Sequence, residues 1–393
     1  MHDEIDFLRI ALVVSGLSVV LCKLKKEGVS MRVRASRSIA LDVVRCFALF
    51  SVFGVHFFLN NGFYQQTVAG GRMFVMTVMR SGFMVCVPLF ILLTGYLMCN
   101  KKLSRGYYTR IIRILCIYIL ASGFCIVYKL LVQKNGQSIL GAVSDVFSYR
   151  AAPYSWYIEM YIGLFLLIPF LNIIWHGLES KRQKQWLVVT FAILTIVPGA
   201  LNIFRFSDLS WWVQPSSNST YFQLVPQWWQ NVYPVTYYFL GAYLREYPLR
   251  LKPVHNLLLL LSAVLGFGAF SYYRSYGSVF LWGVWQNWGS LLITVETVLV
   301  FVFLLERNYD WMPAGLQKLI GKVSEWSLGA FMVSWVFDNL FYAKLNSMVP
   351  VPTERLEWFV VVVPLVFVGS VVTAAILELI YSLTVGRLLE KKN

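Results

Sequence analysis

The sequence predicts an all-α, polytopic membrane protein with about ten transmembrane helices. Of its 393 residues, 58% are hydrophobic and only 13% are charged, and the mean hydropathy is +0.63. Soluble domains carry about 25% charged residues, so this chain is expected to lie largely in lipid. Its apolar runs are continuous over about twenty residues, whereas the strands of outer-membrane barrels alternate over about ten. These observations exclude a soluble enzyme, a disordered chain and a disulfide scaffold, and they disfavour an outer-membrane barrel.

Each expected helix is an apolar run of the length that spans a bilayer. The ten expected spans cover residues 40–59, 80–98, 111–132, 155–175, 186–204, 228–244, 255–272, 288–305, 324–343 and 358–380.

The N-terminal segment has two interpretations. The apolar run at 5–21 is short, contains Arg9 and follows three acidic residues, and Met31 opens a second, basic start. Residues 1–37 are therefore either a leader with an extra helix or the product of an over-long start. A cleaved signal peptide fits poorly because the usual basic n-region is acidic here. The remaining expected parts are a membrane domain at 38–385 and a cytoplasmic tail at 386–393.

The charge balance is strongly basic, with 34 Lys and Arg against 19 Asp and Glu. Most of these basic residues fall in alternate loops, as the positive-inside rule requires. The pattern predicts a multi-pass protein of the cell (inner) membrane with a cytoplasmic C-terminus, surrounded by lipid, and argues against binding of nucleic acid. The six cysteines form no C-x-x-C pair and are expected to be small buried side chains, so no metal site is predicted.

Three ionisable residues in the first expected span form one stripe. Arg45 and His56 are eleven residues apart, which is about three helical turns, and Asp42 precedes Arg45 by one turn. Ionisable groups inside a membrane are costly and therefore candidates for function. A neutral imidazole is the usual general base near pH 7, so His56 is the first candidate for proton transfer. The structural alternative pairs Asp42 with Arg45 and bonds His56 to a neighbouring helix.

A second basic feature lies before the third expected span. Arg110 and Arg113 are three residues apart and share a helix face. Guanidinium groups suit phosphate oxygens, although a basic loop is also an ordinary topology signal.

Four further residues rank as supporting candidates. Trp156 and Glu159 lie one turn apart, and Glu159 could orient an acceptor or His56, or simply pack between helices. Thr94 and Tyr96 flank Gly95, which permits close approach of a neighbouring backbone. The other intramembrane acids are expected to pair with Arg80, Lys129 or Arg45, in combinations that the sequence leaves open. These acids are Glu296, Asp338 and Glu378.

Several of these segments together resemble the acyltransferase 3 family of integral membrane acyltransferases. Arg45 through His56 fits the family's Arg-x10-His motif, and the Arg110–Arg113 pair matches its basic pair. Further similar segments are Val87–Leu97, with Thr94 in place of the usual Ser, Ser155–Tyr161, Leu167–Leu171 and Ser327–Ser334. The last segment often ends in His in the family and ends in Ser334 here, which puts a role for a second histidine in doubt.

The resemblance implies transfer of an acyl group, most often acetyl, from cytoplasmic acyl-CoA to a hydroxyl of an extracytoplasmic glycan or lipid-linked glycan. In that reading Arg110, Arg113 and Arg45 bind the donor, and His56, with Arg45, is catalytic. Asp42, Thr94, Tyr96, Trp156 and Glu159 are supporting residues.

The alternative function is a secondary transporter or a flippase for lipid-linked glycans. About ten helices with buried charges fit that class, and prolines can mark its broken helices. Against it, no paired interruptions occur in corresponding halves of the chain. The candidate helix breakers are Pro88, Pro169, Pro234 and Pro364.

Overall fold

The computed structural model describes residues 38–202, 209 and 223–387 as helices joined by loops. Within these residues, extended pairing is limited to two isolated bridges, between Thr67 and Val279 and between Val68 and Tyr276. The predicted all-α class is therefore confirmed. The longer helices are α2 (Ile39–Asn60), α3 (Gly70–Phe83), α4 (Cys86–Met98), α6 (Ile111–Leu131), α7 (Ile139–Phe147), α8 (Trp156–Gly177), α9 (Lys181–Thr195), α12 (Tyr233–Glu246), α13 (Pro253–Ser275), α14 (Leu291–Leu305), α15 (Ala314–Met348) and α16 (Phe359–Tyr381).

Six helical segments in the described part are long and apolar enough to cross a membrane. The chain is a multi-pass membrane protein, but the expected count of about ten spans is not confirmed. Helices α9, α12 and α14 have 15, 14 and 15 residues and are shorter than a bilayer requires. Helix α15 is long and continuous, but polar residues such as Asp338 and Asn339 interrupt its apolar sequence. The six segments are Ile39–Asn60, Gly70–Met98, Arg105–Leu131, Trp156–Gly177, Pro253–Ser275 and Glu354–Gly386.

The expected N-terminal part at 1–37 lies outside the described residues, as do the last six residues of the expected tail. The described part from Ile39 onward belongs to one compact unit.

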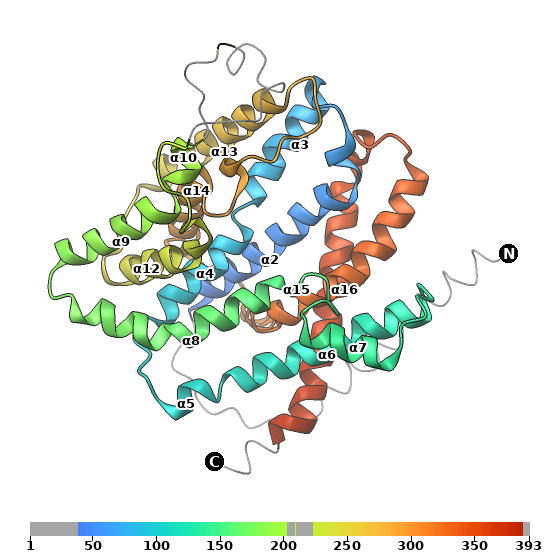
Figure 1. Cartoon of the computed structure of the whole chain (residues 1–393), viewed down its shortest axis with the longest axis horizontal. Helices are drawn as coiled ribbons and strands as arrows, with labels where there is room; N and C mark the ends of the chain where they lie inside the picture. The colour runs from blue at the N-terminus through green and yellow to red at the C-terminus, as the bar shows by residue number, and fades with distance from the viewer. Residues whose placement is uncertain (1–37, 203–208, 210–222, 388–393) are drawn as a thin grey trace. The chain divides into compact units, whose positions relative to one another are not determined.

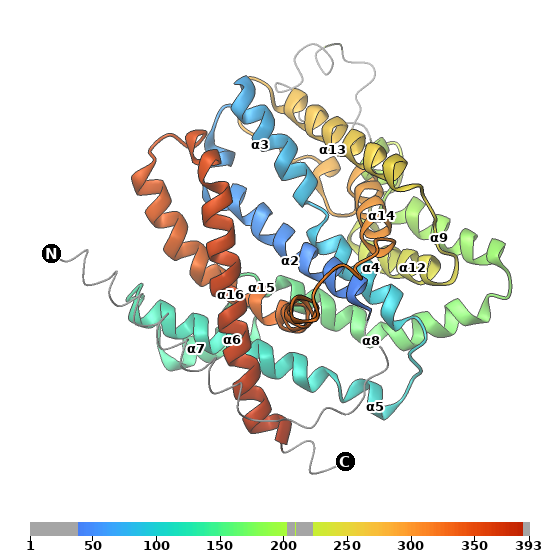
Figure 2. The ribbon, with the colours of Figure 1, turned by 180° about the vertical axis from the view of Figure 1, so that it is seen from behind.

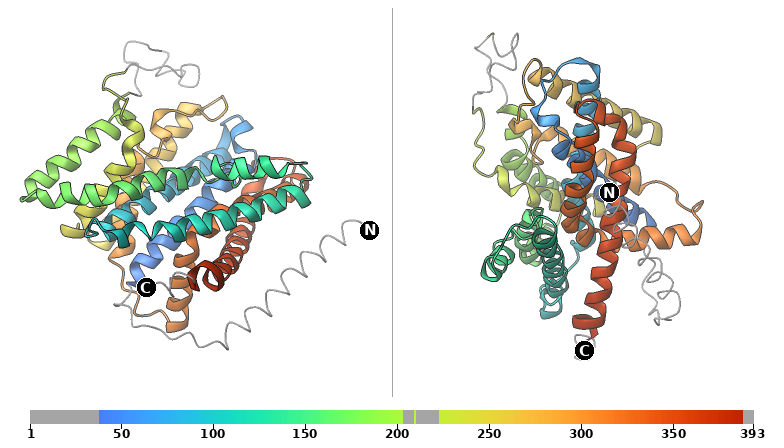
Figure 3. Two further views of the ribbon diagram at one scale, coloured as in Figure 1. Left: turned by 60° about the horizontal axis from the view of Figure 1, so that its bottom comes forward. Right: turned by 90° about the vertical axis from the view of Figure 1, so that its right-hand side faces the viewer.

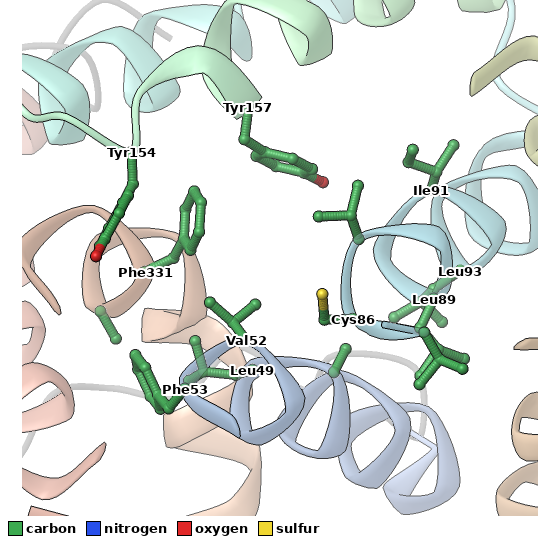
Figure 4. Close-up of a cluster of buried hydrophobic side chains, with 14 of the residues drawn as sticks. Leu49, Val52, Phe53, Cys86, Leu89, Ile91, Leu93, Tyr154, Tyr157 and Phe331 are labelled. Carbon is green, nitrogen blue, oxygen red and sulfur yellow. The ribbon is translucent and has the colours of Figure 1, made fainter. Parts of the chain in front are cut away.

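Helix α2 lies at the centre of this unit (Figure 1). It packs against α15, α4, α3, α14 and α16. Its apolar side chains Leu49, Val52 and Phe53 are buried, and they form one cluster with residues of α4, α8 and α15 (Figure 4). Because α2 also carries the stripe of ionisable residues, its neighbours determine the surroundings of each candidate site residue.

The second apolar segment is broken into α3 and α4 at Met84 and Val85. Pro88 explains the break, because its nitrogen has no hydrogen to donate to the carbonyl of Met84. Leu89 resumes the helical pattern by donating its N–H to Val85. Both α3 and α4 pack against α2.

Two glycines bring α4 and α12 into backbone contact. A Cβ atom on Gly95 would lie 2.0 Å from the carbonyl oxygen of Tyr238, and one on Gly241 would lie 2.0 Å from that of Leu92. The expectation that Gly95 permits close backbone approach is therefore confirmed.

Two further pairs of helices lie side by side. Helix α3 lies beside α13 (Figure 2), and α15 lies beside α16 (Figure 3). Helix α15 also packs along α2, from the end that carries Asp42 to the end that carries Asn60.

Candidate active site

His56 and Asp338 meet in the buried interface between α2 and α15. The Nδ1 atom of His56 lies 3.1 Å from Oδ2 of Asp338, at ion-pair distance but without the geometry of a hydrogen bond. The side chains are 9% and 1% exposed. A carboxylate beside Nδ1 favours the tautomer that is protonated there, which leaves Nε2 as the basic atom. In the described part of the chain, Nε2 has no hydrogen-bond partner.

Tyr154 completes this group from the loop that precedes α8. Its hydroxyl donates a hydrogen bond of 2.7 Å to Oδ2 of Asp338, and its ring lies 4.0 Å from the ring of His56. One carboxylate oxygen therefore serves both the imidazole and the phenol. A buried carboxylate needs such partners, because burial without them is costly. We call His56, Asp338 and Tyr154 the His56 cluster.

Aromatic side chains surround the His56 cluster on the side of α8 and α15. The ring of Phe331 lies 6.3 Å from that of His56 and 5.6 Å from that of Tyr157. Figure 4 shows Tyr154, Tyr157 and Phe331 facing Val52 and Phe53 of α2. These rings limit access of water, which strengthens electrostatic interactions of His56.

The other end of the α2 stripe packs against the first half of α15. Arg45 donates a hydrogen bond of 3.0 Å to the hydroxyl of Ser324. Asp42 is buried and faces Gly321, and the thiol of Cys46 contacts the carbonyl of Ile320. Arg45 and His56 are therefore both held by α15, at heights on α2 that differ by about 16 Å at 1.5 Å per residue.

The predicted basic pair divides into an exposed and a paired arginine. Arg110 occupies the N-cap position of α6, and its side chain is exposed and makes no capping hydrogen bond. Arg113 forms two hydrogen bonds, of 2.7 and 3.0 Å, with Glu378 of α16, and lies 3.9 Å from Glu325 of α15. Lys322 pairs with Glu325 at 3.2 Å. The sequence pattern did not reveal these acids, since they come from helices far along the chain.

A small pocket opens beside Arg113. It lies between α6, α15 and α16, and its lining combines charged and apolar side chains. The lining residues are Arg113, Ile114, Ile117, Glu325, Trp326, Leu328, Gly329, Ala374 and Glu378.

The four supporting candidates lie in different surroundings. Thr94 donates its hydroxyl to the carbonyl of Phe90 in its own helix. The ring of Tyr96 lies under the guanidinium of Arg245, 4.9 Å away. Trp156 stacks on Trp288 at 4.6 Å between ring centres.

Glu159 is exposed, and the acid beside His56 is Asp338. The register of α15 against α2 decides this arrangement, because it brings Asp338 to the level of His56.

The three acids with open partners do not pair as the sequence suggested. Asp338 contacts His56 and Tyr154, and Glu378 pairs with Arg113. Glu296 is buried in α14, and its carboxyl oxygens have no hydrogen-bond partner in the described residues. Arg80 is likewise buried and bonds to Tyr64 and Gln286 instead of an acid. For Arg80, hydroxyl, amide and aromatic partners therefore replace the expected ion pair.

Comparison with known families identifies the chain. Residues 38–376 match the model of the acyltransferase 3 family, which is described as an acyltransferase domain. The chain belongs to this family. The match covers nearly the whole chain, so the protein is a membrane acyltransferase, as the resemblance of its motifs predicted. Searches of the curated proteins and of the solved structures found no match.

Proposed function

We propose that this acyltransferase transfers an acyl group, most often acetyl, from cytoplasmic acyl-CoA to a hydroxyl of an extracytoplasmic glycan or glycolipid. The observation that carries the proposal is the contact between His56 and Asp338, which prepares a buried imidazole for general-base catalysis. The Arg45 end of α2 is assigned to the cytoplasm and the Asn60 end to the outside, in line with the distribution of Lys and Arg. The same rule assigns the protein to the inner membrane with its C-terminus in the cytoplasm.

In the proposed reaction, Nε2 of His56 removes the proton of the acceptor hydroxyl while the oxygen attacks the thioester carbonyl. The carbon–sulfur bond then breaks, and the proton passes from the imidazolium to the departing CoA thiolate. Asp338 stabilises the transient positive charge on His56. The alternative route passes through a covalent acyl-histidine intermediate. We favour direct transfer, because it needs no covalent intermediate on the enzyme. General-base assistance contributes roughly 10²–10⁴-fold to such rates.

The basic residues at the cytoplasmic end are proposed to hold the donor. Arg110 is exposed, and Arg45 and Arg113 approach the same end of α15. Guanidinium groups bind phosphate oxygens with two parallel hydrogen bonds, which suits the phosphates of CoA. Arg113 is already held by Glu378, so donor phosphates would add to that ion pair or compete with it. Asp42, Thr94, Tyr96, Trp156 and Glu159 keep the supporting roles proposed from the sequence.

Release of free CoA from acetyl-CoA by the purified protein in liposomes tests the proposal. Acceptor-dependent release with glycolipid extract is expected from the wild type, and its loss is expected from His56→Ala. The variant should retain the thermal stability and acetyl-CoA binding of the wild type. If His56→Ala still releases CoA in the presence of the acceptor, His56 is not the catalytic base. No release and no CoA binding by the wild type would favour the transporter or flippase function instead.

A further inference from the structure

Three polar side chains continue from the His56 cluster along α15. Asp338, Tyr342 and Asn346 follow each other at intervals of four residues, which places them roughly above one another on one helix face. Asp338 and Tyr342 are 1% and 2% exposed, and Asn346 near the helix end is partly exposed. We call Asp338, Tyr342 and Asn346 the polar face of α15. It runs from His56 to the end of the helix.

Each member of the polar face has an unused hydrogen-bonding atom. Oδ1 of Asp338, the hydroxyl of Tyr342 and Oδ1 of Asn346 are buried and have no partner in the part of the chain that the structure describes. Buried polar atoms are nearly always hydrogen-bonded in native proteins, because leaving them unpaired is costly. Three such atoms in succession beside a candidate general base indicate a site that a polar guest completes.

The opposite helix fixes this face in place. Asn346 donates its side-chain amide to the carbonyl of Asn60 at 2.9 Å, and Asn60 donates its own amide to the carbonyl of His56 at 2.8 Å. The nitrogen of the Asn346 side chain is therefore used, and only its oxygen remains. The polar face thus offers two acceptor oxygens and, between them, a hydroxyl that can donate or accept.

The charges near the polar face select against an anionic guest. Asp338 contributes a negative charge. At the outer end, Arg355 is occupied by backbone carbonyls, and Arg72 is paired with the carboxylates of Glu354 and Glu357. The four acceptors of Arg355 are the carbonyls of Val349, Asn61, Asn346 and Pro350. Hydroxyl groups both donate and accept, so they match the unused atoms without adding charge.

We propose that the polar face of α15 binds hydroxyl groups of an uncharged, polyhydroxylated acceptor and leads one of them to Nε2 of His56. The inference rests on the proposed function and narrows its acceptor to a neutral polyol or sugar segment. Tyr342 and Asn346 are then acceptor-binding residues, while Asp338 serves both His56 and the acceptor.

Tyr342→Phe tests the proposal with minimal disturbance, because it removes only the unpartnered hydroxyl. The matched control is Tyr309→Phe, which removes a hydroxyl bonded to Leu304 beyond the other end of α15. Purified variants are assayed for CoA release from acetyl-CoA, with methyl α-glucoside as a neutral probe and glucuronic acid as an anionic one. Binding of each probe is also measured without acetyl-CoA, by thermal shift.

Tyr342→Phe is expected to raise the KM for methyl α-glucoside about fivefold, the effect of one lost hydrogen bond, and to leave the KM for acetyl-CoA and the Tm unchanged. Tyr309→Phe should leave both KM values unchanged. Methyl α-glucoside should be a better acceptor than glucuronic acid.

If the wild type transfers acetyl groups and Tyr342→Phe has an unchanged acceptor KM, the polar face of α15 does not bind the acceptor. The proposed function would remain intact. A preference for glucuronic acid over methyl α-glucoside would contradict the proposal that the acceptor is uncharged. If the wild type transfers nothing but binds methyl α-glucoside more tightly than Tyr342→Phe does, the proposed function fails and the hydroxyl site stands. If the wild type neither transfers acetyl groups nor binds methyl α-glucoside, the proposed function and the hydroxyl-binding site are both wrong.

Discussion

Asp338 lies 3.1 Å from His56, although the two residues come from opposite ends of the chain. The contact joins α2 and α15, and Tyr154 ties the same carboxylate to the segment before α8. Two helices and the loop before α8 therefore meet at one imidazole.

Replacing Asp338 by Asn should slow acyl transfer by about 10- to 100-fold, because the amide cannot stabilise the imidazolium. Steady-state CoA release measures the change. The control is Asp310→Asn, which alters an exposed carboxylate in the loop before α15. A full rate in Asp338→Asn would contradict the role of the carboxylate.

Replacing Tyr154 by Phe should reduce the rate less, by about tenfold or below, because it removes a single hydrogen bond to a charged group. Since Tyr154 acts through Asp338, the double variant should be no slower than Asp338→Asn alone. A double-mutant cycle of CoA release checks this. Fully additive effects would mean that Tyr154 acts independently of Asp338.

Arg110→Ala and Arg113→Ala should separate donor binding from stability. Arg110 is exposed, so its loss should raise the KM for acetyl-CoA about tenfold without lowering the Tm. Loss of Arg113 should also lower the Tm, because Glu378 then loses its ion-pair partner. Acetyl-CoA kinetics and thermal unfolding of both variants test the difference. An unchanged acetyl-CoA KM in Arg110→Ala would argue against its contact with the donor.

Gly241→Ala should destabilise the protein by about 1–3 kcal/mol or more, because the new methyl group would overlap the carbonyl of Leu92. Thermal unfolding in detergent measures the loss. Gly123→Ala in α6 is the matched control, since a Cβ atom there meets nothing within 4 Å. Its Tm should stay the same or rise slightly, because alanine favours helix more than glycine does. Equal Tm values for the two variants would contradict the close approach of α4 and α12.

The ion pair between Lys184 and Glu246 should make stability depend on pH in the acidic range. Partial burial raises the pKa of Glu246, but hydrogen bonds from Lys184, Tyr247 and Trp175 outweigh it and hold this pKa below its usual value. The pair therefore stabilises the folded state above the unfolded pKa, and the stabilisation is lost as the pH falls through the folded pKa.

Glu246→Gln should accordingly lower the Tm at pH 7 and flatten the decline of Tm below about pH 4.5. Glu306→Gln is the control, because Glu306 is an exposed carboxylate at the C-terminal end of α14. An identical acid profile in Glu246→Gln and the wild type would exclude this contribution.

Local sequence patterns predicted the features that depend on one helix at a time. The length and hydropathy of the runs indicated an all-α membrane protein, and Gly95 indicated a close helix crossing. The stripe on α2 predicted that Arg45 and His56 face the same neighbour, and both do contact α15. Of the candidate helix breakers, Pro88 follows the break between α3 and α4, whereas Pro169 and Pro364 lie inside the continuous helices α8 and α16.

The partners of these residues could not be predicted in the same way. Asp338 stands opposite His56 because of the register between two helices that are distant in sequence, and no pattern within α2 encodes that register. The same holds for Glu378 and Arg113, where α16 supplies the acid. The expected count of about ten spans is not confirmed, because α9, α12 and α14 are shorter than the apolar runs from which spans were predicted there.

The spacing between Arg45 and His56 is a property of helix pitch and cannot be tuned by exchanging side chains. Each residue added to a helix turns everything beyond it by about 100°. One residue inserted between Arg45 and His56 would therefore swing the imidazole away from Asp338 while Arg45 kept its bond to Ser324. The number of residues in this part of α2 can therefore change only by about whole helical turns that are matched on α15.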